Sequence, residues 1–253
     1  STIGFSKTVP WTMTTLDLRD ALQEGRLGES AKQKLASDIN LAIMNVAASQ
    51  STLVVPIATA SGDYDDIALC DSLMNETGVP DNDRFLGLSS RDYNGLAGNL
   101  STASRSFGNA KSDKAYERSF VGMVAGFDTY KFDYANRITA AAGGVTTIDT
   151  QNAAVNYLVP QATSTSVGGQ INVDNRYQTV TVSNTVGIVA GDAFTIDGVV
   201  AVNLITKQST GQLKTFRVIS VTNGTQMVIS PGIISNQVAS DASAQYKNVI
   251  VTP

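Results

Sequence analysis

The stretch from Ser30 to Gln50 most constrains the fold, because its apolar residues recur at the spacing of an α-helix. Ser30 followed by Gln33 is a capping-box pattern, which predicts that this helix begins at Ser30. A helix of some 20 residues is about 30 Å long, so it needs a surface on which to bury its apolar stripe. That stripe, which we expect to be buried, consists of Leu35, Ile39, Ala42, Ile43 and Val46.

The composition predicts a globular protein without a membrane span or a nucleic-acid site. Of the 253 residues, 42% are apolar and 16% are charged, which suits one large or two medium domains. The 18 basic and 22 acidic residues give a net charge of −4. The sequence has no dense cluster of basic residues that could bind the phosphates of a nucleic acid. No apolar run reaches the roughly 18 residues of a membrane span. The single cysteine, Cys70, excludes an internal disulfide.

The rest of the first half predicts helices joined by extended segments. The first helix begins at Thr14 and is ended by Gly25, and Asp63 to Gly78 forms a helix whose inner face holds Ile67, Cys70, Leu73 and Met74. The remaining expectations are an extended arm over 2–13, a link over 51–60, a strand over 84–89, a long loop over 89–113 with one helical turn at 91–97, a helix over 114–124 ended by Gly126, and a half-buried strand over 127–134.

After a boundary at 140–169, which includes a possible strand at 155–159, the helix signals vanish. Short β-branched runs follow at 177–183, 193–196, 199–202, 214–221 and 226–230. The pairs Asp197-Gly198 and Asn223-Gly224 predict tight hairpins with positive φ at both central residues. These strands predict a small antiparallel barrel or sandwich, and closing the sheet is the simplest way for so few strands to hide their edges.

The sequence offers little for catalysis. There is no histidine, no Gly-Lys dipeptide and no lysine with a serine three residues before it. The His-dependent triads, the Walker A phosphate loop and the Ser-x-x-Lys pattern of penicillin-binding proteins are therefore excluded. A carboxylate pair for glycosidic chemistry stays open among the 22 acids. Asp63, Asp65, Asp66, Asp81 and Asp83 lack the pattern of a calcium loop and are interpreted as helix-capping carboxylates. We predict no catalytic residue, no metal ligand and no cofactor.

Two segments resemble the major capsid proteins of tailed double-stranded DNA bacteriophages. The first is Phe120-Val-Gly-Met-Val-Ala-Gly-Phe-Asp-Thr-Tyr, where a helix in that family ends in an Ala-Gly-Phe-Asp turn and feeds a strand. The second runs from Val173-Asp-Asn-Arg-Tyr-Gln-Thr-Val-Thr-Val to Gly191-Asp192 and Phe194-Thr-Ile-Asp-Gly-Val, and is similar to the inserted β-barrel of short-tailed phage coat proteins. The order of parts, from a helix with Leu18 to Asp20 through the long helix to the barrel, agrees as well.

The resemblance implies an α+β capsid fold, with a spine helix and an incomplete axial domain carrying an inserted antiparallel β-barrel. It divides the chain into an N-terminal extended segment and short helix (1–28), the spine helix and partial axial domain (29–160), the barrel (161–250) and the start of a return to the axial domain (251–253). Coat proteins of this class are longer at both ends, so we expect a fragment or a prophage-encoded copy.

The implied function is that of a non-enzymatic capsid subunit. It would self-assemble, as pentamers and hexamers of the intact protein, into an icosahedral head around double-stranded DNA. The implied partners are scaffolding and portal proteins, with no membrane and no specific nucleic-acid site, and assembly would take place in the host cytoplasm. Loops near 203–212 and 234–245 are candidates for contacts between subunits. A β-barrel adhesion module of a phage or host, without catalytic activity, is the alternative.

Overall fold

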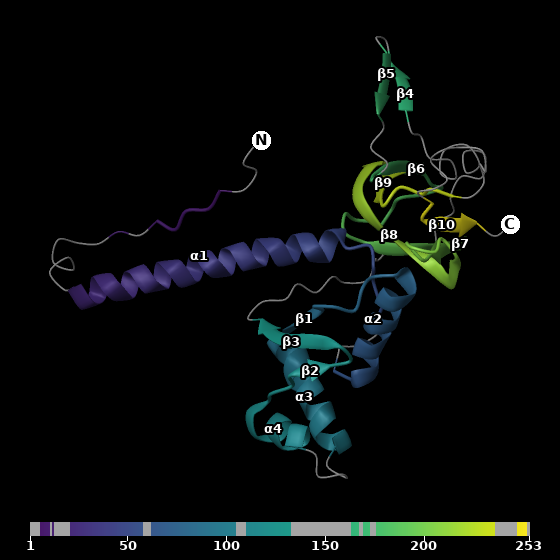
Figure 1. Cartoon of the computed structure of the whole chain (residues 1–253). Coiled ribbons are helices and arrows are strands. Elements are labelled where there is room, and N and C mark those ends of the chain that lie inside the picture. The colour runs from purple at the N-terminus through teal and green to yellow at the C-terminus, as the bar shows by residue number, and fades with distance from the viewer. Residues whose placement is uncertain are drawn as a thin grey trace.

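The protein folds into a long helix, a small helical core and a curled antiparallel sheet (Figure 1). The computed structural model describes residues 6–10, 12, 21–57, 62–104, 110–132, 163–166, 169–172, 176–235 and 247–251. The predictions for Thr14, for Leu18 to Asp20, for the boundary at 140–169 and for the strand at 155–159 lie wholly or mostly outside these residues. This is an α+β architecture, as the sequence predicts.

Helix α1 runs without a break from Ala21 to Gln50, over 30 residues. The predicted end at Gly25 and the predicted start at Ser30 are therefore wrong. A Cβ added to Gly25 or Gly28 would meet nothing within 4 Å, and an exposed glycine costs a helix only about 1 kcal/mol relative to alanine. Ion pairs from Lys32 to Glu29 at 2.8 Å and from Lys34 to Asp38 at 3.0 Å lie along the exposed surface of the helix.

The helical core consists of α2, α3, α4 and a three-stranded sheet. Helix α2 (Tyr64–Thr77) ends at Gly78, whose φ of 89° lets its amide cap the helix, as predicted. Strand β1 (Phe85–Ser89) pairs in parallel with β3 (Phe127–Phe132), and β2 (Met123–Val124) pairs antiparallel with β3, giving the order β1-β3-β2. The strands predicted at 84–89 and 127–134 are confirmed over these residues.

Helix α3 (Ser90–Ser104) occupies the stretch for which a long loop was predicted. The Ser89 hydroxyl accepts a hydrogen bond from the Asp92 amide at 3.2 Å and donates to the Asp92 carboxylate at 2.6 Å, so it caps the helix. Tyr93, Leu96 and Ala97 are buried on one face. The helical turn predicted at 91–97 is confirmed, but the loop predicted around it is wrong, because that packing outweighs the weak helix propensity of the Gly, Asn and Ser residues.

Helix α4 (Ala110–Arg118) is shorter and earlier than the helix predicted over 114–124. Ser119 follows it with a φ of 52°, and Val124 already belongs to β2. Gly126 does not end a helix. With Ala125 it forms the turn of a β2–β3 hairpin, and the positive φ values of 46° and 81° are those that a tight hairpin requires.

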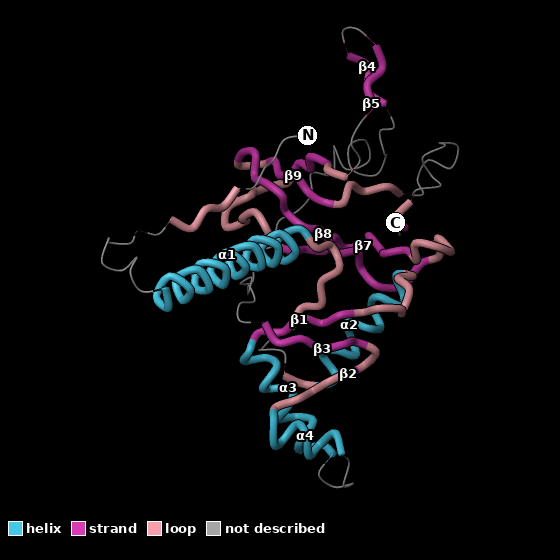
Figure 2. Tube along the Cα trace, turned by 60° about the vertical axis from the view of Figure 1, so that its left-hand side comes forward, coloured by secondary structure: helices cyan, strands magenta, loops and turns pink. Residues whose placement is uncertain are grey.

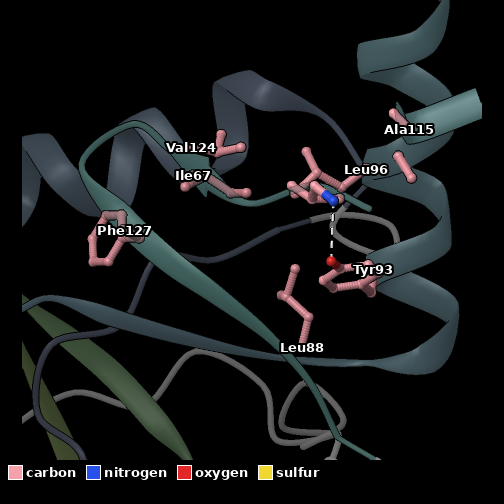
Figure 3. Close-up of a cluster of buried hydrophobic side chains, with 9 residues drawn as sticks. Ile67, Leu88, Tyr93, Leu96, Ala115, Val124 and Phe127 are labelled. Carbon is pink, nitrogen blue, oxygen red and sulfur yellow. Dashed lines mark hydrogen bonds between the residues drawn. The ribbon is translucent and has the colours of Figure 1, made fainter. Parts of the chain in front are cut away.

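The core of this region is a cluster of buried apolar side chains drawn from all of its elements (Figure 3). Tyr93 buries its ring there, and its hydroxyl accepts a hydrogen bond from the Val121 amide at 3.0 Å. The cluster is made of Ile67, Leu88, Tyr93, Leu96, Ala97, Ala115, Val121, Val124 and Phe127, with Cys70 and Met74 packed against it. Of the predicted inner face of α2, Ile67 is fully buried and Cys70 and Met74 are partly buried.

Arg84 joins the end of α2 to the start of β1. Its buried guanidinium donates to Asp71 at 2.5 Å, Asn75 at 2.8 Å and the Val79 carbonyl at 2.6 Å, and Nε donates to the Pro80 carbonyl at 3.0 Å. The group also lies 6.0 Å from the centroid of the Phe127 ring. One arginine therefore satisfies several polar groups where the chain changes direction.

The second half forms a five-stranded antiparallel sheet in the order β10-β7-β8-β9-β6, which we call the barrel sheet. Its strands are β6 (Gln178–Thr181), β7 (Ala193–Val202), β8 (Ser209–Asn223), β9 (Gln226–Ser230) and β10 (Val249–Val251). A separate hairpin joins β4 (Thr163–Ser166) to β5 (Gly169–Asn172). The core of the barrel sheet holds Val180, Val182, Val199, Phe216, Val218, Met227, Ile229, Ile233 and Val249.

The barrel sheet is a curled antiparallel half barrel, which agrees with the predicted antiparallel barrel insertion, although strand pairing does not close it among the described residues. The gap between β6 and β10 is instead spanned by residues 232–235. Ile233 donates its amide to the Gln178 side chain at 2.7 Å, and Asn248 bonds to Gly232 and Ile234 through its side-chain amide. These side-chain bonds, together with the Asn248 and Val249 amides that donate to the Ile234 carbonyl at 3.0 and 3.3 Å, bridge the two ends of the sheet.

The two predicted hairpin turns have different outcomes. Asn223 and Gln226 do pair across the β8–β9 turn, but Gly224 lacks the predicted positive φ; the Asn223 side chain holds the turn by accepting from the Thr225 amide at 2.9 Å. Asp197-Gly198 is not a turn. Strand β7 continues through it with a register shift between Thr195 and Val200, and Gly198 takes a φ of 74°.

Candidate functional site

The described residues contain no cluster of His, Cys, Asp and Glu that could hold a metal ion. Burial, aided by Asp66, raises the pKa of the Cys70 thiol, so this cysteine is a weak nucleophile. Asp63 stands at the N-cap of α2 but makes no capping hydrogen bond; its carboxylate accepts from Asn99 at 2.9 Å. The capping role predicted for Asp63 is therefore wrong. No helix in the described part of the chain is long and apolar enough to cross a bilayer.

The apolar stripe of α1 is exposed rather than buried, which corrects the sequence-based expectation. Leu35, Ile39, Ile43 and Val46 are 36%, 41%, 61% and 55% exposed. Figures 1 and 2 show the reason, since α1 extends away from the rest of the described chain and only its C-terminal end reaches the barrel sheet. The chain therefore presents a helix-long apolar surface to whatever lies beside it.

The outer face of the three-stranded sheet is a second exposed apolar surface. Phe85 and Tyr130 stand on this face with their ring centroids 6.0 Å apart, and both are more than half exposed. Because side chains alternate along a strand, Phe132 shares the face with Tyr130, and its ring lies over Gly87, where a Cβ would come within 1.9 Å of it. The opposite face packs on the core of Figure 3.

The loop between β7 and β8 is held rigidly and carries apolar side chains outward. The Asn203 side chain donates to the Glu76 carbonyl at 2.9 Å and accepts from the amides of Ile205 and Thr206 at 2.9 and 3.0 Å. The Leu204 amide donates to the Thr77 carbonyl at 2.9 Å. Ile205, at the tip, is 76% exposed. The loop is thus fastened to α2 while its tip faces outward.

Arg217 of β8 forms the contact between the barrel sheet and the end of α1. It is buried, its Nε donates to the Ser51 carbonyl at 2.7 Å, and its Nη1 donates to the Gly191 carbonyl at 2.5 Å. Burial lowers the pKa of Arg217, and the nearby charge of Asp192 opposes that shift. A small hollow lies between the barrel sheet and the chain around α2. Its lining residues are Thr52, Leu53, Leu73, Glu76 and Thr77 on the α2 side and Ala201, Thr210, Gln212, Leu213, Lys214 and Thr215 on the side of the barrel sheet.

These features describe a structural protein whose surfaces are shaped to contact other protein. Apolar side chains are exposed on a helix, on a sheet face and on a braced loop, whereas the described residues group no side chains for metal chemistry. Surfaces of this kind are typical of subunits that are completed by their neighbours.

Comparison with known proteins identifies the family. A family model described as "P22 coat protein - gene protein 5" matches residues 1–253. The chain belongs to the P22 coat protein family and is a major capsid subunit of a phage head. The family resemblance inferred from the sequence is thereby confirmed.

Two solved structures are similar to this chain. The CUS-3 coat protein I-domain is 34% identical, with a TM-score of 0.31, over 46% of this chain and 90% of that one. The capsid structure of the cyanophage P-SCSP1u is 16% identical, with a TM-score of 0.32, over 82% of this chain and 60% of that one. The chain therefore matches about three fifths of the length of the cyanophage capsid chain.

Sequence reasoning missed the residues that join the parts. Arg217 lies in an ordinary β-branched run and Asn203 in a polar loop, and their partners Ser51 and Glu76 lie 166 and 127 positions away. Those partners offer only backbone carbonyls, which carry no sequence signal. The single available hint was a basic residue at an otherwise apolar position of a strand.

Proposed function

We propose that this chain, as part of its coat subunit, assembles through its exposed apolar faces into a closed icosahedral head around double-stranded DNA, in rings of five and six subunits. Scaffolding and portal proteins are the proposed partners, the bacterial cytoplasm is the place of assembly, and the subunit performs no catalysis. The observation that carries the proposal is the exposed stripe of α1, because an isolated chain gains nothing by leaving Leu35, Ile39, Ile43 and Val46 in water.

We assign the four segments predicted from the sequence to the parts of the coat fold. Residues 29–160 form the spine helix and part of the axial domain, and 161–250 form the inserted barrel. Residues 1–28 lead into the spine helix, which in the structure already includes Ala21 to Gly28, and 251–253 begin the return. Two separate apolar clusters, one in the helical core and one in the barrel sheet, support treating these as two folding units.

The loop over 203–212 remains a proposed contact between subunits, now with a defined tip. Its base bonds to α2 of the same chain, and its large apolar side chains Leu204 and Ile205 are left exposed to face a neighbour. A loop braced in this way loses little conformational entropy on docking, which favours contact. Of the other proposed loop, 234–245, the structure describes Ile234 and Ser235 alone.

The decisive test is assembly of stripe variants. The full-length coat protein is expressed with its scaffolding protein as the parent, as Ile39→Ser with Ile43→Ser, and as the control Lys32→Ser with Gln33→Ser on exposed positions of the same helix. We expect shells by negative-stain microscopy for the parent and the control, and dispersed subunits with unchanged helicity for the stripe variant. Normal shells from the stripe variant would contradict the role of the stripe, and no shells from the parent would contradict the proposal itself.

A further inference from the structure

The direction of α1 relative to the rest of the chain depends on a small contact. Among the described elements, α1 packs chiefly against β8, and Figures 1 and 2 agree that its C-terminal end meets the barrel sheet. At this point a Cβ on Gly191 would lie 3.7 Å from the Cβ of Ser49, so the two backbones approach closely. The rest of the helix has no comparable support within the described chain.

Arg217 places a positive charge near the C-terminal end of α1. The last four carbonyls of a helix have no partner within it, and a cation near them is favoured by the helix dipole. Helix α1 has no basic residue in its last turn. The Arg217 guanidinium, delivered by β8, lies there instead and donates to the Ser51 carbonyl just past the helix end.

The same guanidinium is fixed on the barrel side. Its Nη1 donates to the Gly191 carbonyl. Two backbone hydrogen bonds join the turn at Gly191 to β8: the Gly191 amide donates to the Val218 carbonyl at 2.7 Å, and the Val218 amide donates to the Asp192 carbonyl at 2.9 Å. Arg217 therefore bridges a rigid turn of the barrel sheet and the terminus of the long helix. Lysine could not reproduce this, because a guanidinium offers donors in a planar fork.

We infer that Arg217 is a positioning residue that sets the direction of α1, so that the barrel sheet, rather than the helical core, orients the spine helix within the subunit. The inference goes beyond the proposed function: it concerns the shape of one chain and holds whether or not that chain forms shells. In a shell built of many copies, the same angle would be repeated in every subunit.

The test measures the distance between α1 and the barrel sheet in solution. Nitroxide labels are placed on Gln33→Cys and Gly224→Cys in a Cys70→Ala background, since Gln33 is exposed and Gly224 has open space around it. Pulsed electron paramagnetic resonance should give one narrow distance distribution for the parent. The Arg217→Met variant should give a broad distance distribution. The matched control is Arg176→Met, because Arg176 is an exposed arginine of the barrel region, and this variant should keep the narrow distribution.

A second pair of variants covers the case in which Arg217→Met does not fold. Ser49→Trp places a large side chain against Gly191 on the surface of the barrel sheet, so it should shift or broaden the distance without touching the barrel core. Ala47→Trp is its exposed control on another face of the same helix turn. A folded Arg217→Met chain with the parent's narrow distance would overturn the inference, and so would an unchanged distance in Ser49→Trp. Neither readout depends on shell assembly.

Discussion

At the scale of single residues, Lys214 is a buried charge without a partner among the described residues. It is 8% exposed, and among the described residues it makes no ion pair or hydrogen bond. Strand alternation puts it on the same side of β8 as Phe216 and Val218, which belong to the core of the barrel sheet. Glu76 is the other charged residue lining the adjacent hollow, and it is exposed. Burial accordingly lowers the pKa of Lys214.

Replacing Lys214 by methionine should stabilise the protein. Methionine keeps the length and apolar body of the side chain and removes a buried charge, whose unsatisfied state costs on the order of 1 to 3 kcal/mol or more. Urea unfolding followed by circular dichroism at neutral pH should show a higher midpoint for Lys214→Met. The control is Lys207→Met, because Lys207 is part-buried and its ammonium donates to the Lys247 carbonyl at 3.3 Å; that variant should gain nothing.

The pH dependence provides an independent check on Lys214. Its folded pKa lies below the ordinary value of 10.5, so between the two values the unfolded chain binds more protons than the folded one. Stability then rises with pH across that window. The free-energy difference between the parent and Lys214→Met should therefore shrink as the pH approaches 10.5. A difference that stays constant with pH would show that folding does not lower the pKa of Lys214.

At the scale of elements, tertiary packing decides where propensity misleads. The residues that usually begin and end helices predicted α2 closely, with Gly78 as its C-terminal end. The same rules failed at Gly25 and at Ser90–Ser104, where glycines and asparagines lie inside helices. In α3 the reason is the buried face formed by Tyr93, Leu96 and Ala97. This face packs in a cluster with side chains of α2, α4, β1 and β3, which a local sequence window does not show.

Two glycine-to-alanine substitutions separate packing from propensity. Gly98 in α3 has nothing within 4 Å of a Cβ, so Gly98→Ala should stabilise the helical core by about 0.5 to 1 kcal/mol. Gly87 in β1 is covered by the Phe132 ring, 1.9 Å from a Cβ, so Gly87→Ala should destabilise it by about 1 to 3 kcal/mol. Thermal unfolding by calorimetry gives both values. Equal shifts in the same direction would refute the packing of Phe132 on β1.

At the scale of the whole molecule, the sequence predicted the parts better than their arrangement. The α+β class, the change to β structure and the family resemblance all follow from residue patterns and from the quoted motifs. The exposed state of the α1 stripe could not follow from them, because periodicity shows that a face is apolar and does not show what covers it. The contacts of Asn203 and Arg217 were equally hidden, since they bind backbone carbonyls far away in the chain.

The attachment of the barrel sheet to α2 leads to a prediction about Asn203. Its side chain accepts from the Ile205 and Thr206 amides and donates to the Glu76 carbonyl, beside the bond from the Leu204 amide to Thr77. Asn203→Ala removes three hydrogen bonds at once, each worth about 1 kcal/mol. We expect the amides of Leu204, Ile205 and Thr206 to exchange with deuterium much faster in this variant, while the core strands of the barrel sheet keep their protection.

Asn223 is the matched control, because it holds a turn in the same way but only within the barrel sheet. Its side chain accepts from the Thr225 amide at 2.9 Å and lies at the β8–β9 turn, with no described contact to α2. Asn223→Ala should therefore speed exchange at Thr225 and leave Leu204 protected. If Asn203→Ala left the Leu204 amide as slow as in the parent, the bond from that amide to the Thr77 carbonyl of α2 would not depend on the Asn203 side chain, and the bracing role of Asn203 would be wrong.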